Sequence, residues 1–206
     1  MPVLKPRMLA AVVCFAGTLA SAGTVQAADD AAKAAGIANE ICAGCHGVDG
    51  NSVAPTFPRL AGQQKVYLLR ELKDFKSGKH VDEVMNPIAS RLSDEDMVNL
   101  AAFYAAQKST PGIVTNPALL PLGKALYMNG NAKSDIPACS SCHEEDGSGG
   151  GKFPRVAGQH VEYTLNELRL YATGKRTNGA RVMQAVAERM SEEETRAVAE
   201  YMASMP

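Results

Sequence analysis

The feature that most constrains the fold of this 206-residue chain is an internal duplication. The heptapeptide at residues 57–63, Phe-Pro-Arg-Leu-Ala-Gly-Gln, returns at residues 153–159 with six of its seven residues unchanged, an offset of 96. Repetition over such a distance is typical of tandem structural units rather than of one continuous core. We therefore expect two similar domains arranged as a pseudo-symmetric pair.

The expected domain boundaries follow from residues that stop helices. Pro111, Gly112 and Pro117 interrupt the chain between the two copies, and such residues end a preceding helix or begin the next one. We predict a first domain over residues 28–110, a linker over 111–117 and a second domain over 118–206. Each half is close to the lower size limit for an independent hydrophobic core.

The first 27 residues have the composition of an export signal. Lys5 and Arg7 precede an uncharged apolar run, and Val25 and Ala27 place small residues where a signal peptidase requires them. We predict that residues 1–27 are a signal peptide, cleaved after Ala27, and that the mature protein is exported. The apolar run is shorter than a membrane-spanning helix needs.

The mature part of the chain is predicted to be all-α. Apolar residues recur at helical spacing over 66–77 and 161–173, each followed by a glycine. Ser93 with Asp96, and Ser191 with Glu194, predict the starts of helices that reach about Gln107 and Ser204. The formal charge of −1 argues against a nucleic-acid partner.

A second duplicated motif lies just upstream of each heptapeptide. Two copies of C-x-x-C-H are present, formed by Cys42, Cys45 and His46 in the first half and by Cys139, Cys142 and His143 in the second. Two thiols at this spacing can form thioethers with the vinyl groups of one porphyrin, and the histidine that follows can then ligate the iron. Zinc binding would leave the histidine unexplained. A redox dithiol would normally lie at a strand–helix junction, and no strands are predicted. A structural disulfide at so short a spacing would constrain little of a domain. We therefore predict two covalently bound haem c groups.

The repeat also indicates the sixth iron ligand. Met85 and Met183 lie at equivalent places, 39 and 40 residues after the motif histidines, which matches the His/Met ligation of many c-type cytochromes. Met97 and Met190 have no methionine counterpart, so we interpret them as core residues. His80 is the alternative ligand of the first haem.

These motifs together resemble cytochrome c4, a family of periplasmic dihaem proteins built from two fused class I cytochrome c domains. In such domains a proline carbonyl accepts a hydrogen bond from the haem-ligating histidine, and Pro58 and Pro154 lie at the matching positions. The alternative is that these two prolines only make their loops rigid. Arg59 and Arg155 would neutralise haem propionates, unless they are merely solvated.

The resemblance implies that the first and last helices of each domain cross, with Gly36 against Phe103 and Gly123 against Tyr201. The spacing from this glycine to the first motif cysteine is 6 residues in the first half and 16 in the second. Ten additional residues therefore precede Cys139.

The resemblance further implies an electron carrier rather than an enzyme, reduced by a quinol-oxidising bc complex and oxidised by a terminal haem–copper oxidase. Peripheral contact with the membrane surface is left open. Two alternatives remain: the dihaem subunit of a dehydrogenase such as a sulfide-oxidising flavocytochrome, and a haem enzyme such as a peroxidase or a thiosulfate dehydrogenase.

Overall fold

The computed structural model describes Met1 and residues 22–206, so most of the predicted signal peptide lies outside the described residues. Over the described range every regular element is a helix, apart from two isolated bridges, Asn131 with Ile136 and Gly150 with Phe153. The predicted all-α class is confirmed. No helix in this part of the chain is long and apolar enough to cross a membrane.

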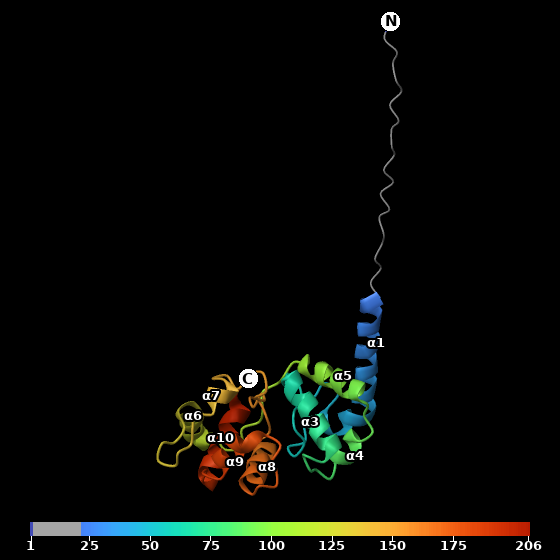
Figure 1. Ribbon diagram of the computed structural model, residues 1–206. Helices are drawn as coiled ribbons and strands as arrows, with labels where there is room; N and C mark the ends of the chain where they lie inside the picture. The colour runs from blue at the N-terminus through green and yellow to red at the C-terminus, as the bar shows by residue number, and fades with distance from the viewer. Residues whose placement is uncertain (2–21) are drawn as a thin grey trace.

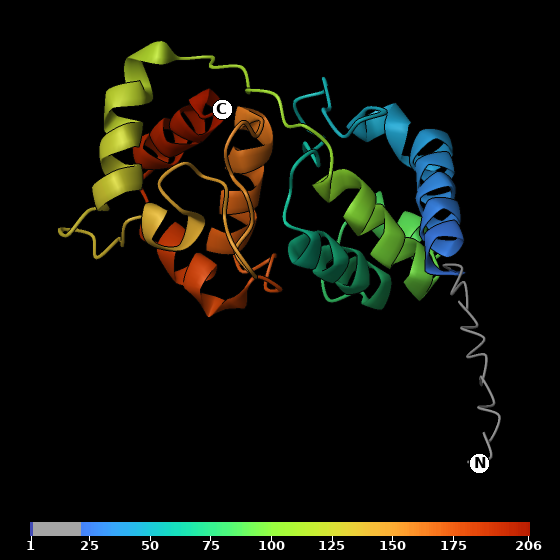
Figure 2. The same cartoon turned by 90° about the horizontal axis from the view of Figure 1, so that it is seen from above.

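The first half packs three longer helices around one core. Its elements are α1 (Ala22–Ile37), a π-helical turn η1 (Ala38–Cys42), α2 (Ala43–His46), α3 (Lys65–Ser77), α4 (Met85–Ala89) and α5 (Asp94–Ala105). Helix α5 lies between α1 and α3 (Figures 1 and 2). Leu68 of α3 and Leu100 and Tyr104 of α5 form the centre of this core.

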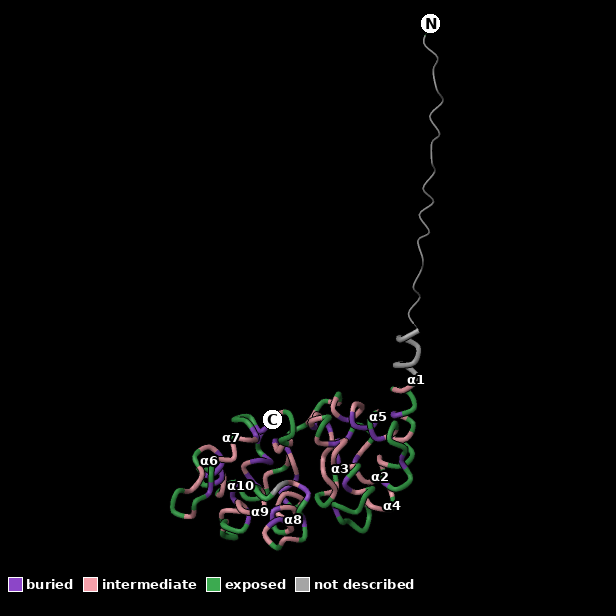
Figure 3. The backbone as a smooth tube through the Cα atoms, in the orientation of Figure 1, coloured by how far each residue is buried: buried purple, intermediate pink, exposed green. Residues whose placement is uncertain are grey.

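The second half repeats this plan. It comprises a 3-10 turn η2 (Pro117–Leu119), α6 (Leu120–Asn129), α7 (Ser140–His143), α8 (Val161–Ala172), α9 (Ala180–Ala187) and α10 (Glu192–Ser204). Helix α10 packs against both α6 and α8 (Figure 1). Buried segments alternate with exposed ones in both halves, so each half has its own interior (Figure 3).

The helix ends follow the local sequence closely. Ser93 and Ser191 each form a complete capping box, with the side chains of Asp96 and Glu194 returning to the capping residue. Helix α3 ends at Ser77, before Gly78 in the left-handed conformation. Helix α5 ends at Ala105, two residues earlier than expected.

The expected crossing contact is present in the second half and absent from the first. A Cβ on Gly123 would lie 2.0 Å from the carbonyl oxygen of Ala197 and 2.8 Å from Cβ of Tyr201, so only glycine permits this approach. The expectation for Gly36 is wrong, because Gly36 is exposed and a Cβ there would meet no atom within 4 Å. Instead Ala34 and Ala38, one turn apart, are the buried positions of this segment.

The ten additional residues before Cys139 contribute to the core of the second half. Asn131 and Ile136 close a tight turn through two backbone hydrogen bonds of 2.8 and 2.9 Å, and Ile136 is buried in that core. The Asn131 side chain also donates to Glu194 at 2.7 Å, which ties the turn to the first turn of α10.

Candidate haem-binding sites

The two C-x-x-C-H motifs occupy equivalent short helices. In the first half η1 ends at Cys42 and α2 carries Cys45 and His46, and in the second half α7 ends at His143. The residue after each histidine has the same backbone conformation, with φ 78° and ψ 156° at Gly47 and φ 65° and ψ 159° at Glu144. Each motif is thus followed by the same sharp change of chain direction. The π-helical turn was not anticipated from the sequence, because it depends on one additional residue per turn rather than on a distinctive residue type.

Both motif histidines are buried and held by a backbone carbonyl. Nδ1 of His46 lies 2.9 Å from the carbonyl oxygen of Pro58, and Nδ1 of His143 lies 2.9 Å from that of Pro154. Burial lowers the pKa of both imidazoles, and the hydrogen bond to proline opposes this only in part. Each ring is therefore neutral, and because Nδ1–H donates to the carbonyl, the lone pair for a metal is on Nε2.

An aromatic ring flanks each histidine in the same geometry. The Phe57 ring meets His46 edge-on with centroids 6.3 Å apart, and the Phe153 ring meets His143 with centroids 6.4 Å apart. These phenylalanines directly precede, in the sequence, the prolines whose carbonyls accept the histidine hydrogen bonds. The repeated heptapeptide therefore encloses the motif histidine in both halves.

The repeated arginines each hold one buried donor without a partner. Nε of Arg59 and Nε of Arg155 are buried and make no hydrogen bond within the described residues. One outer nitrogen of each arginine is occupied: Nη1 of Arg59 donates to the carbonyls of Thr110 and Pro111, each at 2.7 Å, and Nη2 of Arg155 donates to the carbonyl of Pro206. A buried N–H without a partner is costly, and an anionic group such as a haem propionate would satisfy it. These orphaned donors, the paired thiols and the neutral imidazoles fit haem c in both halves.

The two duplicated methionines lie on equivalent segments but in different helical positions. Met85 is the first residue of α4, whereas Met183 lies in the second turn of α9. Both are partly buried, and Met183 packs against the core of the second half. Met97, by contrast, is 1% exposed in the core of the first half, and Met190 packs against the second core.

The other two histidines are engaged elsewhere in the structure. Nδ1 of His80 lies 2.9 Å from Oε2 of Glu71, and its ring stacks on Phe75 with centroids 4.2 Å apart. Nε2 of His160 lies 2.9 Å from the carbonyl oxygen of Ser52. The structure therefore gives His80 a partner other than iron.

The four motif cysteines form no disulfide bond. Burial raises the pKa of the Cys42 thiol, and it raises that of Cys139 to about 11. Among the described residues, no group of three or more His, Cys, Asp or Glu side chains could hold a metal ion.

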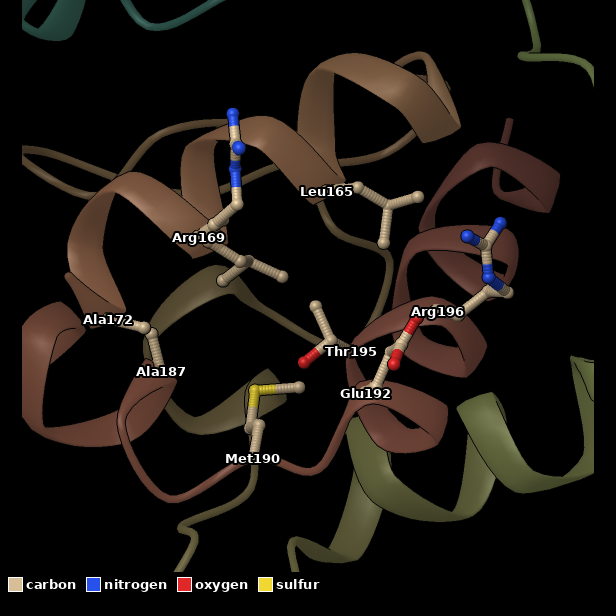
Figure 4. Close-up of a pocket in the computed structure, with 9 residues that line it drawn as sticks. Leu165, Arg169, Ala172, Ala187, Met190, Glu192, Thr195 and Arg196 are labelled. Carbon is tan, nitrogen blue, oxygen red and sulfur yellow. The ribbon is translucent and has the colours of Figure 1, made fainter.

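A cavity of about 330 Å³ opens between α8 and the start of α10 (Figure 4). Leu165, Ala187 and Met190 contribute to its apolar wall, and Thr195 lies at its centre. The equivalent of Thr195 in the first half is Met97, a larger residue that is fully buried there. The cavity thus marks a place where the two halves differ in packing.

The glutamine that ends each heptapeptide forms hydrogen bonds with the opposite half, a role that sequence reasoning missed. The Gln63 side chain donates to the carbonyl of Arg155 at 2.9 Å and accepts from its N–H at 2.7 Å. The Gln159 side chain makes the same two bonds with Arg59, at 3.1 and 2.9 Å. The only available signal was the recurrence of glutamine itself, which does not indicate the partner.

Known proteins share the motifs and the fold described above. The cytochrome c family model matches residues 31–106 and 121–206, most of the chain. Cytochrome c4 of Thiocapsa roseopersicina is 41% identical over 80% of this chain and 87% of that protein. The thiosulfate dehydrogenase electron acceptor of Stutzerimonas stutzeri is 38% identical, over 80% of this chain and 78% of that protein.

A solved structure agrees with the architecture as well as the sequence. Reduced recombinant cytochrome c4 from Pseudomonas stutzeri superposes with a TM-score of 0.79 and 35% identity, covering 85% of this chain and 98% of that one. Two cytochrome c domains, two complete C-x-x-C-H motifs and this agreement over most of the chain establish two covalent haem c groups. The chain belongs to the cytochrome c4 family of dihaem electron-transfer proteins.

Proposed function

We propose that this protein carries electrons in the periplasm, from a quinol-oxidising bc complex to a terminal haem–copper oxidase. One haem is attached through Cys42 and Cys45 and the other through Cys139 and Cys142. The predicted export signal and the family membership support this proposal. The single observation that carries it is the buried histidine–proline hydrogen bond, present at 2.9 Å in both halves.

The axial ligands that we propose are His46 with Met85 and His143 with Met183. When bound, each haem supplies a reversible Fe(III)/Fe(II) couple whose potential is raised by thioether ligation. The carbonyls of Pro58 and Pro154 hold the imidazoles in a fixed tautomer and orientation. Because both axial positions would be filled by the protein, no position is left for a substrate, which favours a carrier over an enzyme.

The protein contributes further by accommodating the propionates. The orphaned Nε of Arg59 and of Arg155 would each donate to a carboxylate, and the charge of the arginine would offset part of the desolvation cost. Both guanidinium groups are already fixed by backbone carbonyls, so little side-chain entropy is lost on pairing.

A redox titration of the oxidised holoprotein and of two variants tests this assignment. We expect two one-electron transitions. Met85→Ala should lower the reduction potential of the first haem alone, and Met183→Ala should lower that of the second haem alone. Met97→Leu is the matched control and should change neither potential. Unchanged potentials in both alanine variants, or rapid cyanide binding by the unmodified protein, would refute the proposed ligation and carrier role.

A thiosulfate-oxidising enzyme is a second candidate donor, because one of the relatives is named a thiosulfate dehydrogenase electron acceptor. The two donors can be separated by mixing the oxidised protein with each purified complex and following haem reduction. Rapid reduction by the bc complex supports the first proposal. Reduction by the dehydrogenase alone replaces it with the second.

A further inference from the structure

A buried cluster of polar side chains joins the two halves at a place that the proposed haem ligation does not use. Its members come from α3 and the following loop in the first half and from α8 and the following loop in the second. They are Tyr67, Glu71, Asp74, His80, Glu167, Arg176 and Asn178. Charged groups are rarely buried between domains without a structural or functional reason.

Arg176 is the centre of this cluster. Its side chain is 3% exposed, and Nη2 lies 3.0 Å from Oε2 of Glu71 in the opposite half. Nη1 contacts Glu167 of its own half, and Nη2 also donates to the Tyr67 hydroxyl at 3.0 Å. Nε donates to Asn178 at 3.1 Å. All three guanidinium nitrogens are thus engaged, an arrangement that the shorter, single-headed lysine side chain cannot reproduce.

Asn178 extends the link to α3 of the first half. Its amide nitrogen donates to Glu71 and to Asp74, each at 3.0 Å. His80 of the first half approaches the same oxygen of Glu71 at 2.9 Å. One carboxylate oxygen, Oε2 of Glu71, therefore receives three donors from two domains, and Arg70 donates to the other oxygen at 3.4 Å.

The cluster lies where equivalent positions of the repeat meet. Glu71 and Glu167 are 96 residues apart, and so are His80 and Arg176. A strict duplication would place the same basic residue at positions 80 and 176, one beside each glutamate. Here a single arginine bridges both carboxylates, and His80 completes the surroundings of Glu71. Positions 80 and 176 have therefore diverged. The second half supplies the bridging arginine, and the first half supplies a glutamate that accepts its hydrogen bond.

We propose that Arg176 is a positioning residue that fixes the orientation of one haem-binding half relative to the other. The paired glutamines form one set of contacts between the halves together with the His160–Ser52 and Gln64–Ser148 hydrogen bonds. Glu71 lies almost two turns farther along α3. Two separated contacts prevent the halves from turning about either one. This inference rests on the proposed function in one respect, because the orientation matters for electron exchange between the two haems.

The energetic consequence of losing Arg176 is large. Its removal would leave the buried Glu71 and the partly buried Glu167 without their shared cation, and Glu71 would keep as basic neighbours Arg70, at 3.4 Å from its other oxygen, and His80. Loss of one partner of a buried ion pair weakens the folded arrangement by a factor of roughly 100 to 1000, or about 3–4 kcal/mol at 1.4 kcal/mol per tenfold change. We expect the loss to appear as separation of the halves, since each half has its own core.

Two amides report this separation directly. The backbone N–H groups of Arg59 and Arg155 donate across the interface to Gln159 and Gln63. In the Arg176→Met holoprotein we expect their hydrogen exchange to accelerate by up to roughly 100- to 1000-fold. Core amides in α5 and α10 should exchange as in the unmodified protein. The Arg169→Met variant, which alters an exposed arginine of α8, is the matched control and should leave the interface amides unchanged.

Circular dichroism in the Soret band provides the second measurement, because the couplet produced by two interacting haems depends on their mutual orientation. We expect the couplet to shrink in Arg176→Met while the absorption spectrum of each haem is retained. Arg176→Lys should recover part of it, because the charge remains. Unchanged exchange at both amides together with an unchanged couplet would overturn the proposal.

If Arg176→Met fails to fold, a variant that also carries Glu71→Gln and Glu167→Gln decides the question, because no unpaired carboxylate is then buried. Loss of the couplet in this variant supports the proposal, and retention overturns it. The outcome is distinguishable from failure of the proposed function. An unmodified protein that exchanges no electrons with the bc complex or the oxidase, yet shows an intact couplet, contradicts only the function.

Discussion

The backbone at Glu144 gives a sharp prediction about stability. Glu144 follows the second haem-motif histidine with φ 65° and ψ 159°, a region that is occupied almost entirely by glycine and costs about 1–3 kcal/mol for other residues. Gly47, at the equivalent place in the first half, adopts the same conformation. Glycine adds about 0.4–1 kcal/mol of conformational entropy to the unfolded chain, which opposes the gain. We therefore expect Glu144→Gly to stabilise the folded protein by a net amount of about 0.5–2 kcal/mol.

Guanidinium-induced unfolding of the oxidised holoprotein measures this gain as a higher midpoint with an unchanged slope. Two controls separate the backbone effect from the change of charge. Glu144→Gln removes the charge alone and should leave the midpoint close to that of the unmodified protein. Glu145→Gly removes a neighbouring exposed glutamate and introduces a glycine where no positive φ is relieved, so it should lower the midpoint. If Glu144→Gly lowers the midpoint as Glu145→Gly does, the proposed strain is absent.

Three further predictions concern packing and pH. Thr195→Met fills the cavity of about 330 Å³ beside α10 and should stabilise the protein by about 0.5–2 kcal/mol in thermal unfolding. An unchanged or lower unfolding temperature would contradict this expectation. Gly123→Ala places a methyl group 2.0 Å from the Ala197 carbonyl oxygen and should destabilise the protein by about 1–3 kcal/mol or more. Gly36→Ala, on an exposed helical face, should instead stabilise it by up to about 1 kcal/mol. Equal effects of the two substitutions would contradict the packing described. Burial raises the pKa of Glu71, but the His80 hydrogen bond and the charged Arg176 outweigh it and lower the pKa from 4.5 to about 2. The resulting stability, about 3 kcal/mol, is fully present above pH 4.5 and is lost as the pH falls toward 2, so acid titration of stability should be flatter in Glu71→Gln than in the unmodified protein.

Much of the fold could be predicted because its signals are local. The capping serines, the glycine after α3 and the spacing of apolar residues predicted helix ends within about two residues. The hydrogen bonds between His46 and Pro58 and between His143 and Pro154 span only 12 and 11 residues. Their sequence spacing was therefore informative.

The contacts between the halves could not be predicted in the same way. Gln63 and Arg155 are 92 residues apart, and Arg176 and Glu71 are 105 apart. Nothing in a single sequence indicates which distant backbone a glutamine reaches. The Gly36 expectation failed for a related reason, since glycine spacing does not show which face of α1 is buried. That face is decided by where Ala34 and Ala38 lie, next to the π-helical turn.

The reciprocal glutamine bonds have a consequence for how the two halves associate. Each half offers the other one glutamine side chain and one arginine backbone, which is the self-complementary pattern of a twofold dimer. Fusion through a short linker makes this association intramolecular, and short linkers correspond to effective concentrations in the millimolar range. Pairing of the halves is therefore independent of how dilute the protein becomes. Every molecule carries its two haem sites as a matched pair, however few molecules a cell contains.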